Sequence, residues 1–117
     1  MIICSKLSVW DDTSVSTSLA GAGTEADPFL IRSAADFAYL RSGNTAGKYF
    51  KLMTSIDLNN RAFTIDFFNG ILDGNHCSVR GLNITNTADK TGLFRELGEG
   101  SYVHDLSLYG TVSGQIR

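Results

Sequence analysis

The sequence has no run of basic residues, and this shortage excludes a class of partner. Its 10 Lys and Arg residues are scattered among 12 Asp and Glu residues, which leaves a formal net charge of −2. A protein that binds the phosphate backbone of nucleic acid normally gathers its basic residues into a patch. We therefore expect no nucleic acid partner.

Long apolar segments are also lacking. The apolar start of the chain, residues 1–4, ends at Ser5 and Lys6, far short of the hydrophobic region of a secretory signal peptide. No stretch approaches the roughly 20 apolar residues of a membrane-spanning helix. We expect no membrane insertion, and a chain that is made in the cytosol and stays there or leaves inside an assembled particle.

Cysteine is scarce, and the two that occur match no metal-binding spacing. Cys4 and Cys77 stand far apart, whereas a structural zinc site needs more ligands at closer intervals. Two free thiols are the favoured interpretation, and a disulfide between the N-terminal region and the middle of the chain stays open. Phosphate-binding glycine loops and calcium-binding nonapeptide repeats are absent, so neither a cofactor nor a metal ion is expected.

Glycine and alternating apolar residues are abundant by contrast. The 12 glycines and single proline indicate many tight turns between short strands, and the 43% of hydrophobic residues suffices for a core. Apolar and polar residues alternate over 49–52, 55–58 and 63–67, as in strands with one buried face. The sequence therefore predicts an all-β fold in one domain.

One short helix interrupts the strands, near residues 33–42. Ser33 is placed as its N-cap with Asp36 three residues later, and Gly43 ends it. We divide the chain into an N-terminal arm or docking segment, residues 1–23, and a β domain, residues 24–117, with this helix as its cap.

An internal repeat indicates how the strands stack. Two segments match at a constant offset of 24 residues, so that the apolar positions of one coincide with those of the other. The expected core of this repeat consists of Val79, Leu82, Ile84, Val103, Leu106 and Leu108. A fixed offset is typical of a solenoid, which would stack Leu82 on Leu106 and Ile84 on Leu108. We expect a short parallel β-helix of about three to four coils.

Several segments in order resemble the GLUG-repeat modules of bacterial surface adhesins and phage tail or virion proteins. The resemblance lies in residues 21–31, 33–37, 47–58, 68–76 and 91–94. It implies a right-handed parallel β-helix. The chain departs from the family pattern because it stops after few coils and has Arg95 where a glycine is common. An uncovered end needs a partner, so a homo-oligomer, a trimer above all, is expected.

Some β-helix proteins cleave polysaccharides, so acid–base residues were considered. The candidates are Asp57, Asp66, Asp73, His76, His104 and Asp105. Asp73 is explained by the Asp73-Gly74-Asn75 turn, and a histidine without a fixed partner is more often structural. We expect no catalytic residues and no enzyme activity, with a polysaccharide lyase or hydrolase as the residual alternative.

Exposed aromatic residues offer another kind of site. Trp10, Tyr102 and Tyr109 could stack on sugar rings, as aromatics do in glycan-binding modules. The competing interpretation, which we favour, has Trp10 anchoring the N-terminal arm and the tyrosines lying along one face of the solenoid.

These observations lead to a non-enzymatic protein that presents a surface. The first hypothesis is a phage virion component, such as a capsid decoration, head fibre, or tail fibre or spike, assembled in the host cytoplasm with other virion subunits. The alternative is a glycan-binding adhesin module located outside the cell or on its surface, with a host-cell glycan as partner.

Overall fold

The strands follow the alternation of apolar residues along the chain. In the computed structural model, which describes residues 4, 6–11, 13–61, 63–86 and 93–114, Tyr49–Leu52 forms a strand whose residues are alternately half-buried and buried. Phe50 and Leu52 point inward, while Tyr49 and Lys51 lie on the other face, as the twofold period of a strand requires.

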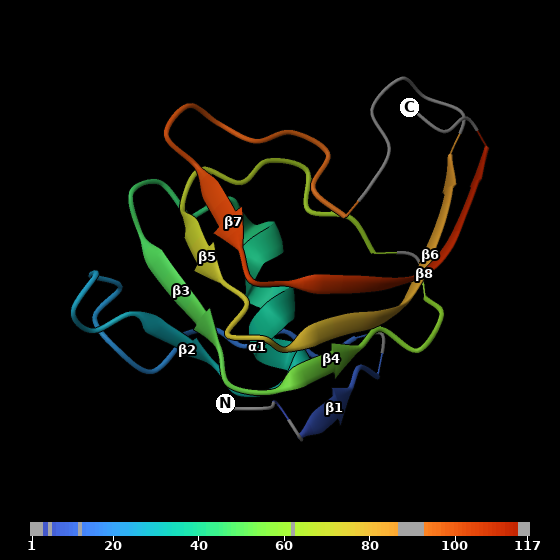
Figure 1. The fold of residues 1–117 in the computed structure, drawn as a ribbon, viewed down its shortest axis with the longest axis horizontal. Helices are drawn as coiled ribbons and strands as arrows, with labels where there is room; N and C mark the ends of the chain where they lie inside the picture. Colours follow the sequence, from blue (N-terminus) through green and yellow to red (C-terminus); the bar gives the residue numbers. More distant parts are fainter. Residues whose placement is uncertain (1–3, 5, 12, 62, 87–92, 115–117) are drawn as a thin grey trace.

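The described strands form two parallel sheets of four strands each (Figure 1). One sheet has the order β1–β4–β6–β8, with β1 at Leu7–Val9, β4 at Ser55–Asp57, β6 at Ser78–Asn86 and β8 at Ser107–Gly114. The other has the order β2–β3–β5–β7, with β2 at Phe29–Ile31, β3 at Tyr49–Leu52, β5 at Ile71–Asp73 and β7 at Tyr102–His104. From β3 onward, successive strands alternate between the two sheets.

A short helix contacts a strand of each sheet. The helix α1, Ala34–Ala38, contacts β2 of one sheet and β4 of the other, and continues as the 3₁₀ turn η1, Tyr39–Ser42. The hydroxyl of Ser33 accepts a hydrogen bond from the backbone N–H of Asp36, so the expected N-cap is present. Phe37 is fully buried and brings the apolar face of α1 against the core.

A series of aromatic rings in mutual contact runs along the core, beside its aliphatic residues. Phe50 contacts Phe29 and Phe68, with ring centroids 5.7 and 5.9 Å away, and Phe68 contacts Phe94 at 5.3 Å. Such tilted ring pairs add to the stability that burial of the rings already gives. The buried core also includes Ile56 and Val79 of the other sheet, so the two sheets share one core.

The expected fold class, a regular right-handed parallel β-helix, is wrong. The structure has two four-stranded parallel sheets and one short helix, and the proposed 24-residue repeat does not govern the pairing. Val79 pairs with Leu108 in one sheet, whereas Val103 pairs with Leu72 in the other. The two valines that the repeat aligns therefore belong to different sheets.

The expected stacking partners are wrong for the same reason. Leu82 pairs with Gly110 and Ile84 with Val112, each four residues beyond the leucine that the repeat predicted. The connection between β6 and β7 is longer than that between β4 and β5, so no constant offset survives. Leu106 is partly buried, and Leu108 is 48% exposed. Of the repeat motif at 91–94, Thr91 and Gly92 lie outside the described residues.

The N-terminal region is part of the β1–β4–β6–β8 sheet. The strand β1 pairs with β4, and Cys4 forms a disulfide with Cys77, which lies just before β6. The expectation of two free thiols is therefore wrong, because the fold brings together two cysteines that the sequence separates. The division of the chain at residue 23 stays a prediction, although β1 pairs with β4 beyond that boundary.

Replacing one of two neighbouring residues on β5 tests the assignment of its faces. Leu72 is fully buried and Ile71 is partly exposed on the other face. We expect Leu72→Ala to lower the free energy of unfolding by about 2–5 kcal/mol, and Ile71→Ala to lower it by about 1 kcal/mol or less. Urea denaturation measures both, and equal losses would contradict the assignment.

Reduction of the disulfide tests its contribution to stability. The bridge closes a loop with a sequence separation of 73, and the chain-entropy argument gives such a cross-link about 4 kcal/mol. We expect dithiothreitol to lower the urea midpoint of the protein clearly. The variant with both Cys4→Ala and Cys77→Ala is the control, because its midpoint should not respond to the reductant. An unchanged midpoint on full reduction of the parent protein would contradict the assignment.

Candidate functional site

The outer face of the β2–β3–β5–β7 sheet carries a row of aromatic and aliphatic side chains that are partly or largely exposed. Tyr49, Ile71 and Tyr102 are register partners on β3, β5 and β7. Since neighbouring strands lie about 4.8 Å apart, the two tyrosines at the ends of this row are about 10 Å apart at their backbones. Tyr102 is 60% exposed, so the row ends in an aromatic ring in contact with solvent.

A second row, two residues further along the same strands, consists of polar and ionisable side chains. Lys51, Asp73 and His104 are register partners and lie on the same face as the tyrosines. The outer face of this sheet therefore sets an apolar row beside a polar one. The ring of His104 stacks on that of Tyr102, with centroids 4.9 Å apart and planes at 18°.

A hollow of about 380 Å³ opens on this face. The residues that line it come from β3, β5, β7 and the loop before β2, and they are Glu25, Pro28, Tyr49, Ile71, Asp73, Tyr102 and His104. The loop is held to the sheet by a hydrogen bond from the backbone N–H of Tyr49 to the carbonyl of Gly23. Glu25 and Pro28 thus form a wall beside the apolar row.

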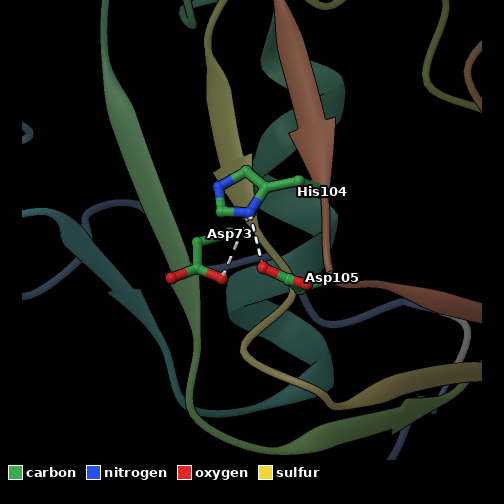
Figure 2. A group of neighbouring side chains, drawn as sticks. All are labelled: Asp73, His104 and Asp105. Carbon is green, nitrogen blue, oxygen red and sulfur yellow. Dashed lines mark hydrogen bonds and ion pairs between the residues drawn. The ribbon is translucent and has the colours of Figure 1, made fainter.

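Three ionisable side chains meet at the polar side of this hollow (Figure 2). The Nδ1 atom of His104 lies 2.8 Å from Oδ2 of Asp105 and 3.9 Å from Oδ1 of Asp73. Figure 2 shows the imidazole on one side of the two carboxylates, with Nδ1 directed at both. A protonated His104 would pair with both carboxylates at once.

The corner between β7 and β8 fixes Asp105 in this position. Asp105 has a left-handed backbone with φ of 56°, and its carbonyl accepts a hydrogen bond from the backbone N–H of His76. The backbone of Gly74 packs closely against that of Asp105. A Cβ atom at position 74 would lie only 2.4 Å from the Asp105 carbonyl oxygen. The absence of a side chain at Gly74 thus lets the two corners approach each other.

The same three side chains could offer ligands to a divalent cation. Asp73, His104 and Asp105 each present one donor atom, and these atoms lie within 4.8 Å of one another. Carboxylate oxygen and imidazole nitrogen are both common metal ligands. All three side chains are also partly exposed to water, and the contacts of Nδ1 of His104 with the two carboxylates account for the arrangement by themselves.

The remaining acid–base candidates lie elsewhere. Asp57 accepts a hydrogen bond from the backbone N–H of Asn59, and Asp66 lies 3.6 Å from Arg95 on an exposed surface. His76 is exposed at the corner between β5 and β6, where it has a left-handed backbone. The fold therefore brings together three of the six candidates.

The three candidate aromatics are also separated. Trp10 is only 2% exposed and packs against Phe63, with Arg41 over its ring at 5.0 Å, so it lies inside the core. The chain after Trp10 turns at Asp11, whose pKa is lowered to about 2 by hydrogen bonds from Ser14 and Thr13.

Tyr102 and Tyr109 are exposed but belong to different sheets, on β7 and β8. Only Tyr102 lines the hollow. Sequence reasoning missed Tyr49, Ile71 and Glu25, which line it too. The alternation along 49–52 shows that Tyr49 faces outward, yet nothing in the sequence indicates that β7 lies next to β5.

Comparison with known proteins yields distant relatives of much greater length. The chain is 32% identical over 111 residues to a protein of Evansella cellulosilytica described as a Gly-rich membrane protein, a match that covers 80% of the chain and 13% of that protein. It is 27% identical over 114 residues to the protein named Halomucin of Haloquadratum walsbyi, covering 84% of the chain and 1% of that protein. No protein-family model and no solved structure matches the chain.

These matches leave the resemblance to GLUG-repeat modules as a prediction. The chain spans a small fraction of each relative, so neither match assigns it to a family. Within the described residues, no helix has the length and apolar character needed to cross a membrane.

A substitution at Gly74 tests how the two corners position the cluster of Asp73, His104 and Asp105. In Gly74→Ala the new Cβ must displace backbone atoms of Asp105 and Leu106, and such overpacking costs about 1–3 kcal/mol. We expect large amide chemical-shift changes from His104 to Ser107. Gly43→Ala is the control, because its Cβ would meet open space and should change shifts near residue 43 alone. Unchanged shifts at Asp105 in Gly74→Ala would contradict this packing.

Proposed function

We propose that this chain is a non-enzymatic module of a much larger cell-surface protein, which displays the outer face of the β2–β3–β5–β7 sheet. The single observation that carries the proposal is the disulfide between Cys4 and Cys77. Disulfides form and persist in oxidising surroundings outside the cytosol, and are rare in most cytosolic proteins. A cross-link within a domain of this size therefore favours an extracellular location.

The relatives support the same proposal. Both are far longer than the chain, and one has the word membrane in its description. Matches that cover most of a chain but a small part of each relative are typical of a module within a large protein. They favour the alternative of a cell-surface module over the first hypothesis of a phage virion component.

The arrangement of ionisable groups supports a binding role over catalysis. Among the described candidates, the carboxylates of Asp73 and Asp105 come nearest to an acid–base pair, and Nδ1 of His104 is close to both. General acid–base cleavage needs one carboxyl protonated and one ionised across a bound substrate. Here Nδ1 of His104 lies 2.8 Å from one carboxylate and 3.9 Å from the other, so both carboxylates face the histidine and not each other across a space for substrate.

The oligomeric state stays a prediction. The strands β7 and β8 each lie at one edge of their sheets, and Tyr102, Leu108 and Tyr109 on them are exposed. The unpaired N–H and C=O groups of an exposed edge strand can pair with another chain or with another part of the same chain. A trimer is one arrangement that would cover these edges.

Labelling of thiols in the producing cells tests the proposed location. Cells are quenched in acid, and the protein is treated with a maleimide–polyethylene glycol reagent with and without prior reduction. We expect no label before reduction and two labels after it, because both cysteines are in the bridge. Cys4→Ser is the control and should carry one label without reduction. Two labels on the unreduced parent protein would overturn the proposal of an oxidising compartment.

A further inference from the structure

We propose that the hollow on the β2–β3–β5–β7 sheet binds carbohydrate, with a sugar ring over the row formed by Tyr49, Ile71 and Tyr102. The inference rests on the proposed function, since the module would then face glycans outside the cell. It goes further by naming the ligand class and the residues that hold it.

The apolar row provides a surface for the C–H face of a sugar ring. The three side chains are in register, so they form a strip across three strands. Tyr102 packs on one side against the imidazole of His104 and is still 60% exposed. This stacking fixes the orientation of the ring before any ligand arrives, so little conformational entropy is lost on binding.

The groups beside the row match the hydroxyls of a sugar. Glu25 and Asp73 supply carboxylate acceptors, and the tyrosine hydroxyls both donate and accept. One ring nitrogen of His104 contacts the carboxylates, which leaves the other nitrogen for a ligand. A sugar hydroxyl also both donates and accepts. An ammonium group only donates, so it would satisfy the carboxylates but none of the donors.

The size of the hollow favours a small ligand over a protein surface. Its volume of about 380 Å³ falls at the lower end of the range for small-molecule sites, which is about 300–1,000 Å³. A stable protein partner would need about 800 Å² of surface on each side. One or two sugar rings fit the hollow, and a protein would have to extend well beyond it.

A single site of this kind binds weakly. For a ligand of one or two sugar rings in an open hollow we expect a Kd of about 1 mM. Display of many copies on one surface would raise the overall affinity, because each bound copy holds the next site close to its ligand.

Amide chemical-shift titration of the intact chain tests the inference. The probes are cello-, chito-, manno- and galacto-oligosaccharides of three to six units, each added to about 20 mM, a range set by the expected Kd. At least one probe should shift the amides of Tyr49, Ile71, Asp73, Tyr102 and His104 together. Absence of any shift on this face with all four probes would overturn the inference, as would shifts confined to other parts of the chain.

Variants separate the stacking ring from the polar groups. We expect Tyr102→Leu and Asp73→Asn each to weaken binding of the active probe about tenfold or more. The first removes one stacked ring, and the second removes one hydrogen bond to a carboxylate. Tyr109→Leu is the matched control, since Tyr109 is equally exposed but lies on the other sheet. Thermal unfolding of each variant checks that it is folded. Equal weakening by Tyr109→Leu would overturn the assignment of the site.

Two further probes distinguish other occupants. Choline chloride that shifts this face when no sugar does would overturn the inference in favour of a cationic ligand. Binding of sugar that persists in the presence of a chelator supports contact through the side chains alone, whereas its complete loss would overturn direct recognition by them.

The outcome is independent of the proposed location. Failure of every sugar to bind would leave the thiol-labelling result intact, and free thiols in the cell would leave a measured sugar affinity intact. Release of shortened oligosaccharides during the titration would contradict the non-enzymatic role while supporting the binding site.

Discussion

Parallel, in-register pairing of very short strands is the constraint on which the rest of this structure depends. Along β2, β3, β5 and β7 the partners of Phe50 are Phe29 and Leu72, so one face of the sheet is apolar throughout. The opposite face receives Tyr49 and Ile71 from the same strands. A slip of one residue in any pair would exchange the two faces and expose the core. The register that builds the core therefore also builds the row of exposed side chains.

The corners between the sheets complete the candidate site, since they turn the chain without disturbing this register. The corner after β7 places Asp105 in a left-handed conformation, and the corner after β5 supplies Gly74, over which Asp105 packs. Cys77 lies at this second corner and ties it to Cys4 beside β1. The disulfide and the turn residues thus lie close to the cluster of Asp73, His104 and Asp105, although these residues are far apart in the sequence.

Local features could be predicted from the sequence, whereas pairing could not. The alternation over 49–52 and the cap at Ser33 arise from interactions within a few residues, and both are present in the structure. The 24-residue offset failed because alternating Leu and Ile residues fit any strand with one buried face, whatever its neighbour. Trp10 was a candidate for the exposed surface and is buried, because Phe63 and Arg41 cover it. The disulfide was left open for the same reason: a contact between residues distant in sequence depends on the complete fold.

The two faces of the β2–β3–β5–β7 sheet contribute unequally to the stability of this small domain. Leu72 and Phe50 are buried and sustain the fold, whereas Tyr102 contributes little to it because more than half of its surface stays in water. Side chains in the outer row can therefore change with small effects on folding. The disulfide adds stability that is independent of either face, since it acts chiefly on the unfolded chain. Two or three residues of the outer row can therefore be replaced while the register beneath them stays the same.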